Sequence, residues 1–157
     1  MFRIAVIDGQ GGGIGSLIVK RLRDEFGESV EIIALGTNST ATTQMMKAKA
    51  NRGATGENAI VYNSKRVDLI VGTVSIIVAN GMLGELTPKM AAAVASADCP
   101  KILLPLNQEH INIVGIQREP LPHLVEEMIK MIKEYLGSKG EGSQLSLIHI
   151  SEPTRQA

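Results

Sequence analysis

The stretch that decides the fold is Asp8-Gly9-Gln10-Gly11-Gly12-Gly13-Ile14-Gly15, which directly follows the apolar run Ile4-Ala5-Val6-Ile7. Five of its eight residues are glycines. Apolar residues then recur at the spacing of one helix face, at Ile14, Leu17, Ile18, Leu22 and Phe26. This order predicts a strand, a glycine turn and a helix, the first unit of a dinucleotide-binding fold. In such a unit glycines let the backbone approach a phosphate, whose charge is met by the unpaired N–H groups of the helix.

The spacing of the glycines narrows the kind of loop that is expected. The pattern G-x-G-x-x-G is not met, because Ile14 stands where a glycine would have to follow Gly9 and Gly11. The pattern G-x-x-x-G-x-G is met through Gly9, Gly13 and Gly15, and it is similar to the nucleotide loop of short-chain dehydrogenases. A P-loop is excluded because no Gly-Lys-Ser/Thr follows. Two alternatives stay open, namely a nucleotide-binding loop, which the extra glycines favour, and a tight turn without a ligand.

Composition sets the class of protein and excludes several partners. The chain has 157 residues, 16 of them basic and 16 acidic, so it lacks the positive charge that a nucleic-acid partner requires. No apolar run is long enough to cross a membrane, and the first one is too short for a signal peptide. The single cysteine, Cys99, excludes an internal disulfide and fits a reducing compartment. We therefore expect a cytoplasmic protein with no nucleic-acid or membrane partner.

The remaining pattern predicts an α/β fold. After the first strand, strands are expected over residues 30–35, 68–71 and 101–106, and helices over 41–50, 55–66, 87–97 and 121–136. Residues 111–116 follow the preceding strand too closely for a parallel crossover, so they are expected to pair antiparallel at the edge. The prediction is a three-layer, Rossmann-like fold with a mostly parallel sheet and an antiparallel edge strand.

The C-terminal part of the sequence is set apart from the fold. Residues 145–155 resemble the translation of a sequencing adapter, and the polar, glycine-rich run 137–143 before them is typical of a domain end. We therefore expect a single domain over residues 1–138, followed by a flexible end and a non-native tail over 139–157. His149, in that tail, is excluded from functional reasoning.

Several loops are expected to meet at the carboxyl edge of the sheet, where open α/β sheets bind ligands. They are the glycine loop, the end of the second strand, the start of the helix over 55–66, and the connection over 72–86. The predicted cofactor-binding residues are Asp8, Gly9, Gln10, Gly11, Gly12, Gly13, Ile14, Gly15, Gly36, Thr37, Asn38, Arg52, Thr55, Gly56, Thr73 and Asn80. For residues 51–58, an ordinary solvated turn remains an equal alternative.

The second strand ends in Gly36-Thr37-Asn38, without the acidic residue that usually binds a ribose diol. This absence disfavours the standard mode of NAD binding. It leaves a phosphorylated ribose, as in NADP, with Thr37, Asn38 or Ser39 as donors. Asp8 also departs from the small or hydroxyl residue common at its position. It is expected either to bond the N–H groups of its own turn or to bind a ribose, a hydroxyl or a metal-bound water.

No side chain is a convincing catalytic group. Tyr135 and Lys139 match the Tyr-x-x-x-Lys pair of short-chain dehydrogenases, in which the lysine lowers the tyrosine pKa. However, Gly137 interrupts the pair at the expected helix end, and Tyr135 belongs to the apolar stripe, so a core role is expected. His110 and His123 are expected on the surface, and a metal site is not expected.

Four motifs together resemble a known family. They are Asp-Gly-Gln-Gly-Gly-Gly-Ile-Gly at 8–15, Ala-Leu-Gly-Thr-Asn at 34–38, Asn-Arg-Gly-Ala-Thr-Gly-Glu-Asn at 51–58 and Met-Leu-Gly-Glu-Leu-Thr-Pro-Lys-Met at 82–90. The chain resembles, over about residues 2–136, a family of short bacterial proteins described only as a domain of unknown function. The resemblance implies a single Rossmann-like domain and assigns no activity or catalytic residue.

Three functions follow as hypotheses. The first is a protein that binds a nucleotide or dinucleotide, NADP(H) or NAD. For it, a binding or sensing role is expected at least as much as catalysis. The second is a small NAD(P)-dependent oxidoreductase. The third is a partner-binding module with a vestigial pocket, for which a self-complementary apolar patch and a homo-oligomer would be expected.

Overall fold

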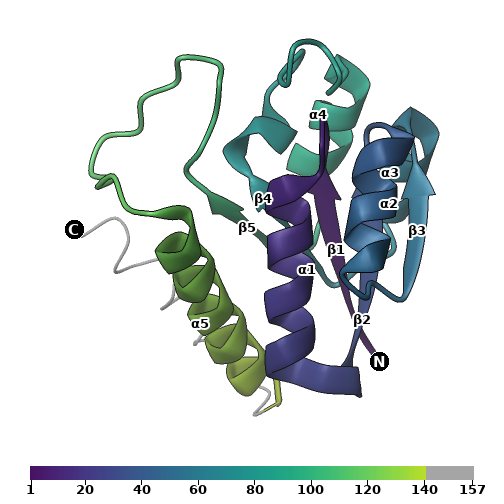
Figure 1. The fold of residues 1–157 in the computed structure, drawn as a ribbon, viewed down its shortest axis with the longest axis vertical. Coiled ribbons are helices and arrows are strands. Elements are labelled where there is room, and N and C mark those ends of the chain that lie inside the picture. Colours follow the sequence, from purple (N-terminus) through teal and green to yellow (C-terminus); the bar gives the residue numbers. More distant parts are fainter. Residues whose placement is uncertain (141–157) are drawn as a thin grey trace. The chain divides into compact units, whose positions relative to one another are not determined.

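The computed structural model describes residues 1–140, in two compact units that divide after Asn112. The first unit holds a five-stranded sheet in the order β3-β2-β1-β4-β5 (Figure 1). Its strands are β1 (Phe2–Asp8), β2 (Val30–Gly36), β3 (Arg52–Thr55), β4 (Leu69–Thr73) and β5 (Lys101–Leu104). Its helices are α1 (Gly13–Phe26), α2 (Ser39–Lys47), α3 (Glu57–Ser64) and α4 (Pro88–Ala95), with 3-10 turns η1 (Gly27–Ser29) and η2 (Val74–Ile77).

The predicted α/β fold class is confirmed, and the layers follow from the strand pattern. All four strand pairings are parallel. Parallel sheets are covered on both faces, so their central strands are apolar throughout, and Ile4–Ile7 are indeed fully buried. Side chains alternate along a strand, so Ala5 and Ile7 pack in the core with α3 and α4, while Ile4 and Val6 face the opposite side. Consistently, α1 packs with α2 and α3 packs with α4.

The expected antiparallel edge strand over 111–116 is wrong, because the described chain forms no strand after β5. Asn107 explains the difference. Its Oδ1 accepts hydrogen bonds from the N–H groups of Glu109 and Ile111, both at 3.1 Å, and its Nδ2 donates to the Ile111 carbonyl at 3.0 Å. This local turn engages backbone groups that a strand ladder would need.

Residues 51–58 form neither a simple turn nor the start of a long helix. Arg52–Thr55 is strand β3, in register with residues 33–36 of β2. The helix begins after Gly56, whose φ of 101° is incompatible with helix, so α3 covers Glu57–Ser64 instead of 55–66. This strand was not predicted, because it is four residues long and mostly exposed and therefore carries no apolar alternation.

The other boundaries differ by local capping. Asn38, before the expected start at residue 41, caps α2 by accepting a hydrogen bond from the Ala41 N–H at 2.8 Å. The predicted Thr87-Pro88 helix start is confirmed: the Thr87 hydroxyl accepts a hydrogen bond from the Met90 N–H, and Pro88 is the first residue of α4.

The second unit, described by itself, contains α5 (Leu121–Gly140). This helix continues through Gly137, which was expected to end it. No helix within residues 1–140 has both the length and the apolarity that crossing a bilayer would demand. The adapter-like segment 145–155 and His149 lie outside the described residues, and the single domain over 1–138 stays a prediction.

Candidate functional site

The carboxylate of Asp8 bonds the two ends of the glycine turn. Asp8 ends β1, and it is only 8% exposed. Its Oδ1 accepts a hydrogen bond from the Gly9 N–H at 2.8 Å, and its Oδ2 accepts one from the Gly15 N–H at 2.7 Å, in the first turn of α1. Burial raises the pKa of Asp8, the two N–H bonds oppose that shift, and the nearby charge of Glu85 adds to it. Of the two expectations for Asp8, the contacts match the bonding of its own turn.

Packing requires a glycine at only some positions of the loop. Gly12 has a φ of 73°, and its N–H donates to the Gly9 carbonyl at 2.9 Å. A Cβ added at this position would lie only 2.8 Å from the backbone of Ala41. At Gly11 and Gly13, in contrast, a Cβ would meet no atom within 4 Å. Packing therefore explains Gly12 but leaves open space in front of Gly11 and Gly13.

Three backbone donors in the same stretch, residues 11–14, lack an acceptor within the described residues. Among residues 1–140, the N–H groups of Gly11, Gly13 and Ile14 donate no hydrogen bond to the protein. They stand at the N-terminus of α1, where unpaired N–H groups carry the positive end of the helix dipole. This arrangement can hold an anionic group without a basic side chain.

A carboxylate that the sequence did not single out joins the site from a distant loop. Oε1 of Glu85 accepts hydrogen bonds from the Gln10 N–H at 2.7 Å, from the Thr37 hydroxyl at 2.7 Å and from Asn38 Nδ2 at 3.0 Å. These three bonds outweigh desolvation and hold the pKa of Glu85 below its usual range. Gly9 has to be a glycine here, because a Cβ would lie 2.5 Å from Thr37 Oγ1 and 2.9 Å from Glu85 Oε1.

The loop that carries Glu85, residues 80–86, is fixed on two sides. Gly81 and Leu86 form an isolated antiparallel bridge that closes the loop. On the other side Glu109 accepts hydrogen bonds from the Ser75 hydroxyl at 2.7 Å and from the Met82 N–H at 3.1 Å. Met82 and Leu83 have φ values of 58° and 57°. Left-handed conformations of such side chains cost about 1–3 kcal/mol each, and they cluster at ligand clamps and switch segments.

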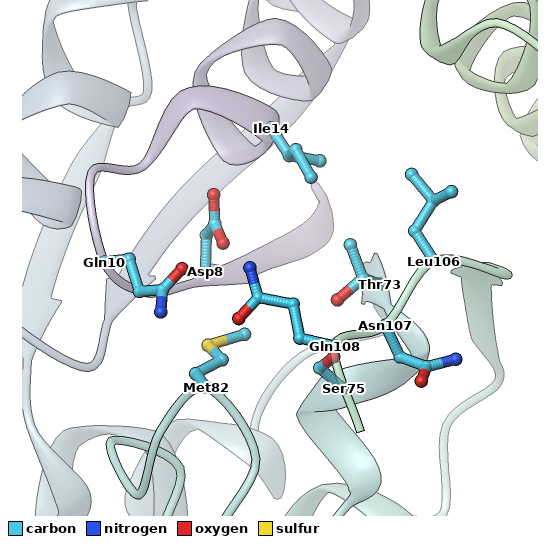
Figure 2. A pocket seen from close by; sticks show the side chains of 9 residues that line it. All are labelled: Asp8, Gln10, Ile14, Thr73, Ser75, Met82, Leu106, Asn107 and Gln108. Atoms are coloured by element: carbon cyan, nitrogen blue, oxygen red, sulfur yellow. The ribbon is translucent and has the colours of Figure 1, made fainter. Parts of the chain in front are cut away.

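A pocket of about 200 Å³ opens beside the glycine turn (Figure 2). It lies where the segments after β1, β4 and β5 meet, which is the point at which the strand order reverses, the usual ligand position in such sheets. Its lining consists of Asp8, Gln10, Ile14, Thr73, Ser75, Met82, Leu106, Asn107 and Gln108. Of these, Asp8, Gln10, Ile14 and Thr73 were predicted. The connection over 72–86 was expected at this edge, but Ser75 and Met82 within it were not singled out, and the segment after β5 was not indicated.

The end of β2 meets the glycine loop as expected. The Thr37 N–H donates to the Asp8 carbonyl at 3.0 Å, and Asn38 Nδ2 donates to the Gln10 carbonyl at 3.0 Å. Gly36 lies opposite Asp8 in the sheet register. Both predicted side-chain donors, Thr37 and Asn38, thus stand beside the turn and are already bonded to Glu85.

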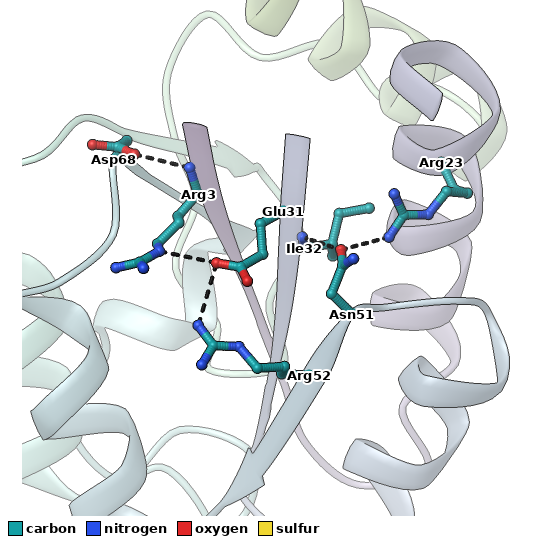
Figure 3. A network of polar contacts seen from close by, with 7 residues as sticks. All are labelled: Arg3, Arg23, Glu31, Ile32, Asn51, Arg52 and Asp68. Atoms are coloured by element: carbon teal, nitrogen blue, oxygen red, sulfur yellow. Dashed lines mark hydrogen bonds and ion pairs between the residues drawn. The ribbon is translucent and has the colours of Figure 1, made fainter. Parts of the chain in front are cut away.

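The structure does not bring Arg52 to the site. Arg52 opens β3 opposite Ile33, and its guanidinium reaches back toward the amino end of β2, where it lies 3.2 Å from Glu31, which also pairs with Arg3 at 2.9 Å (Figure 3). The glycine turn follows β1 at the carboxyl edge of the sheet, where Asp8 lies opposite Gly36 of β2 and Gly36 lies opposite Thr55 of β3. This correction follows from the strand that replaced the expected turn, because it places Arg52 at a strand start.

Four other candidates are not among the residues that line the pocket. The Thr55 hydroxyl bonds the Thr42 hydroxyl at 2.7 Å, and the Gly56 N–H donates to the Gly36 carbonyl at 2.9 Å. Asn80 has a φ of 65° and closes the 80–86 loop through its N–H bond to Leu86. Tyr135 lies in α5, within the second unit.

The described residues offer no other chemical centre of the kinds considered from the sequence. His110 and His123 do not line the pocket, and His123 lies 3.3 Å from Glu119 on the surface. Residues 1–140 hold no cluster of three or more His, Cys, Asp or Glu side chains that could bind a metal ion.

Comparison with known proteins gives a family model and a similarity to a solved structure. A family model described as a domain of unknown function, DUF3842, matches residues 3–137. No curated protein matches the chain. A dodecameric FMN-dependent Ubix-like decarboxylase from Escherichia coli O157:H7 is similar in structure, with 13% sequence identity and a TM-score of 0.42. The match covers 85% of this chain and 94% of that chain.

Proposed function

The chain belongs to the DUF3842 family, whose description names no activity, and from the site alone we propose that it is a cytoplasmic nucleotide-binding protein. The nucleotide lies across the carboxyl edge of the sheet, and its phosphate faces the start of α1. One observation carries the proposal: within residues 1–140 the N–H groups of Gly11, Gly13 and Ile14 have no acceptor, and Ile14 lines the pocket. Backbone donors at a helix start are a recognised way of holding a phosphate.

The surroundings of these donors support a nucleotide more than a free anion. No lysine or arginine lines the pocket, so an inorganic anion would find neutral donors but no cation, beside the carboxylate of Asp8. A nucleotide adds hydroxyl and ring groups that can bond the side chains of Thr73, Ser75 and Gln108. The volume of about 200 Å³ is below the usual range of about 300–1,000 Å³ for a whole ligand pocket. The bound molecule therefore extends along the open edge toward the end of β2.

A binding or sensing role is favoured over catalysis. A general acid or base needs a carboxyl or imidazole that is free to exchange a proton with the ligand. Both oxygens of Asp8 accept backbone N–H bonds, and one oxygen of Glu85 accepts three bonds. Hydrogen bonds fix both carboxylates in the loop and lower the pKa of Glu85, so Glu85 stays an ionised acceptor and the pocket has no assigned proton donor.

The proposal is tested by a thermal-shift screen of the full chain against NAD, NADP, FMN, FAD, ATP, GTP and S-adenosylmethionine. Ligand at a hundredfold its dissociation constant adds about 2.7 kcal/mol to the stability of the folded state, which raises the melting temperature visibly. A shift with at least one nucleotide is expected. No shift with any of them contradicts the proposal.

A second candidate function has one observation in its favour. Residues 111–116 expose four aliphatic side chains, Ile111, Ile113, Val114 and Ile116, of which Val114 is 100% exposed. Such a run is typical of a surface that binds a partner or a second copy. Mass measurement by light scattering over a hundredfold range of concentration tests self-association. A monomer at every concentration removes the support for a homo-oligomer.

A further inference from the structure

Glu85 supplies, from another part of the chain, the carboxylate that β2 lacks. In dinucleotide-binding folds an acidic side chain at the end of the second strand accepts hydrogen bonds from the ribose hydroxyls. Here β2 ends at Gly36, and Thr37 and Asn38 follow it. The Glu85 carboxylate lies against these two residues, at 2.7 Å from the Thr37 hydroxyl and 3.0 Å from Asn38 Nδ2. A carboxylate is therefore present at that place although the local sequence has none.

Its second oxygen remains available to a ligand. All three hydrogen bonds to Glu85 reach Oε1, and among residues 1–140 no group donates to Oε2. A carboxylate oxygen accepts but never donates while it is ionised, so Oε2 suits a hydroxyl donor. The side chain is also held in advance, because its three donors come from the glycine loop and from the end of β2, and little ordering remains for binding to require.

The charges around Glu85 decide which ribose can lie there. The segments that would surround the ribose, residues 9–15, 36–39 and 80–86, contain no lysine or arginine. A phosphate on the ribose 2′-hydroxyl would face the Glu85 anion without a cation to compensate it. The same position favours a free diol, whose two hydroxyls donate to a carboxylate. This reverses the expectation drawn from Gly36-Thr37-Asn38 alone, which left a phosphorylated ribose.

We propose that Glu85 is the ribose-reading residue of the site and restricts its ligand to nucleotides with an unphosphorylated 2′-hydroxyl. The inference rests on the proposed nucleotide-binding function. It makes Glu85 a specificity determinant, and it assigns the strained loop 80–86 the role of holding that carboxylate at the end of β2. The ligand class is then NAD-like instead of NADP-like.

The test compares the dissociation constants of NAD and NADP for the full chain, its Glu85→Gln variant and its Glu31→Gln variant. Glu31→Gln is the matched control, because it removes a carboxylate from β2 itself, where Glu31 pairs with Arg3 and Arg52, and Glu31 neither lines the pocket nor bonds the glycine turn or the loop 80–86. Circular dichroism and the melting temperature of each variant establish that it is folded before binding is measured.

The expected result is that the unmodified chain binds NAD at least about tenfold more tightly than NADP, as loss of a charged hydrogen bond predicts. Glu85→Gln should weaken NAD binding by about tenfold and bring the ratio of the two constants close to one, whereas Glu31→Gln should keep the ratio. A ratio that Glu85→Gln leaves unchanged, or tighter binding of NADP by the unmodified chain, overturns the inference. Binding of another nucleotide without NAD or NADP overturns it too but leaves the proposed function standing. Binding of no nucleotide overturns both.

Discussion

The Thr37 hydroxyl donates a 2.7 Å hydrogen bond to the carboxylate of Glu85, a residue 48 positions further along the chain. This contact joins the end of β2 to the loop 80–86, and the same Glu85 oxygen binds the N–H of Gln10 in the glycine turn. Three segments that are separate in sequence therefore meet at one carboxylate. The meeting point lies at the carboxyl edge of the sheet, beside the pocket and the start of α1.

Gly13→Ala separates ligand binding from folding. A Cβ at Gly13 would meet no protein atom within 4 Å, and alanine is a better helix former, so stability should stay level or rise by up to about 1 kcal/mol. The methyl group would add bulk on the open side of the loop, next to the unpaired N–H groups of Gly13 and Ile14, so the affinity for the nucleotide should fall at least about tenfold. Melting temperature and titration calorimetry measure the two effects.

Gly12→Ala is the matched control, one residue away. Gly12 has a φ of 73°, and a Cβ there would lie 2.8 Å from the backbone of Ala41. It should cost about 1–3 kcal/mol of stability. If Gly13→Ala instead destabilised the protein while leaving its affinity intact, the open face of the loop would not be a ligand site.

The dependence of stability on acidic pH should show the lowered pKa of Glu85. Its pKa is lowered in the folded protein from 4.5, so its stabilising contribution is present above pH 4.5 and is lost as the pH falls through the folded-state pKa. The difference in melting temperature between the unmodified chain and Glu85→Gln should therefore be largest above pH 4.5 and shrink below it. Thermal unfolding between about pH 3 and 7 measures this difference.

Asp8 should show the opposite trend in the same experiment. Burial raises its folded-state pKa above 3.8, so its contribution is complete below pH 3.8 and declines as the pH rises through the folded-state pKa. The stability of the unmodified chain relative to Asp8→Asn should thus increase as the pH falls. The same trend in both variants would contradict the assigned environments.

Arg52→Ala should leave the affinity for a nucleotide unchanged. Arg52 pairs with Glu31 at the amino end of the sheet, and its side chain is 61% exposed. An exposed ion pair contributes about 0–1 kcal/mol, so the melting temperature should change little. A loss of affinity measured by calorimetry would show that Arg52 reaches the ligand, which a position at the amino end of β3 does not allow.

The parts of the fold that the sequence predicts are those with local causes. The apolar run before the glycines and the helical spacing after them lie within residues 4–26, and they predict β1, the turn and α1 correctly. Thr87 and Pro88 are a cap and a first helical residue in direct succession, so the start of α4 is also readable. The meeting of the loops after β1 and β2 follows from parallel topology alone.

The parts that the sequence misses depend on contacts between distant residues. Glu85 has no local pattern, because its three donors belong to segments about 50 to 75 positions earlier in the chain and only the folded loop brings it there. β3 exists through its pairing with β2 and not through an apolar pattern of its own. Asn107 turns the chain where propensity favoured a strand, since its side chain competes with the ladder.

Amide NMR of the uniformly ¹⁵N-labelled full chain, titrated with a nucleotide that gives a thermal shift, reports directly on the start of α1. We expect the amide protons of Gly11, Gly13 and Ile14 to move downfield more than those of other residues, because they acquire a phosphate acceptor that the protein does not provide. The amides of Gly12 and Gly15 already have acceptors within the protein, so they should move less. Unchanged resonances of Gly11, Gly13 and Ile14 at saturation would contradict the claim that the start of α1 holds the phosphate.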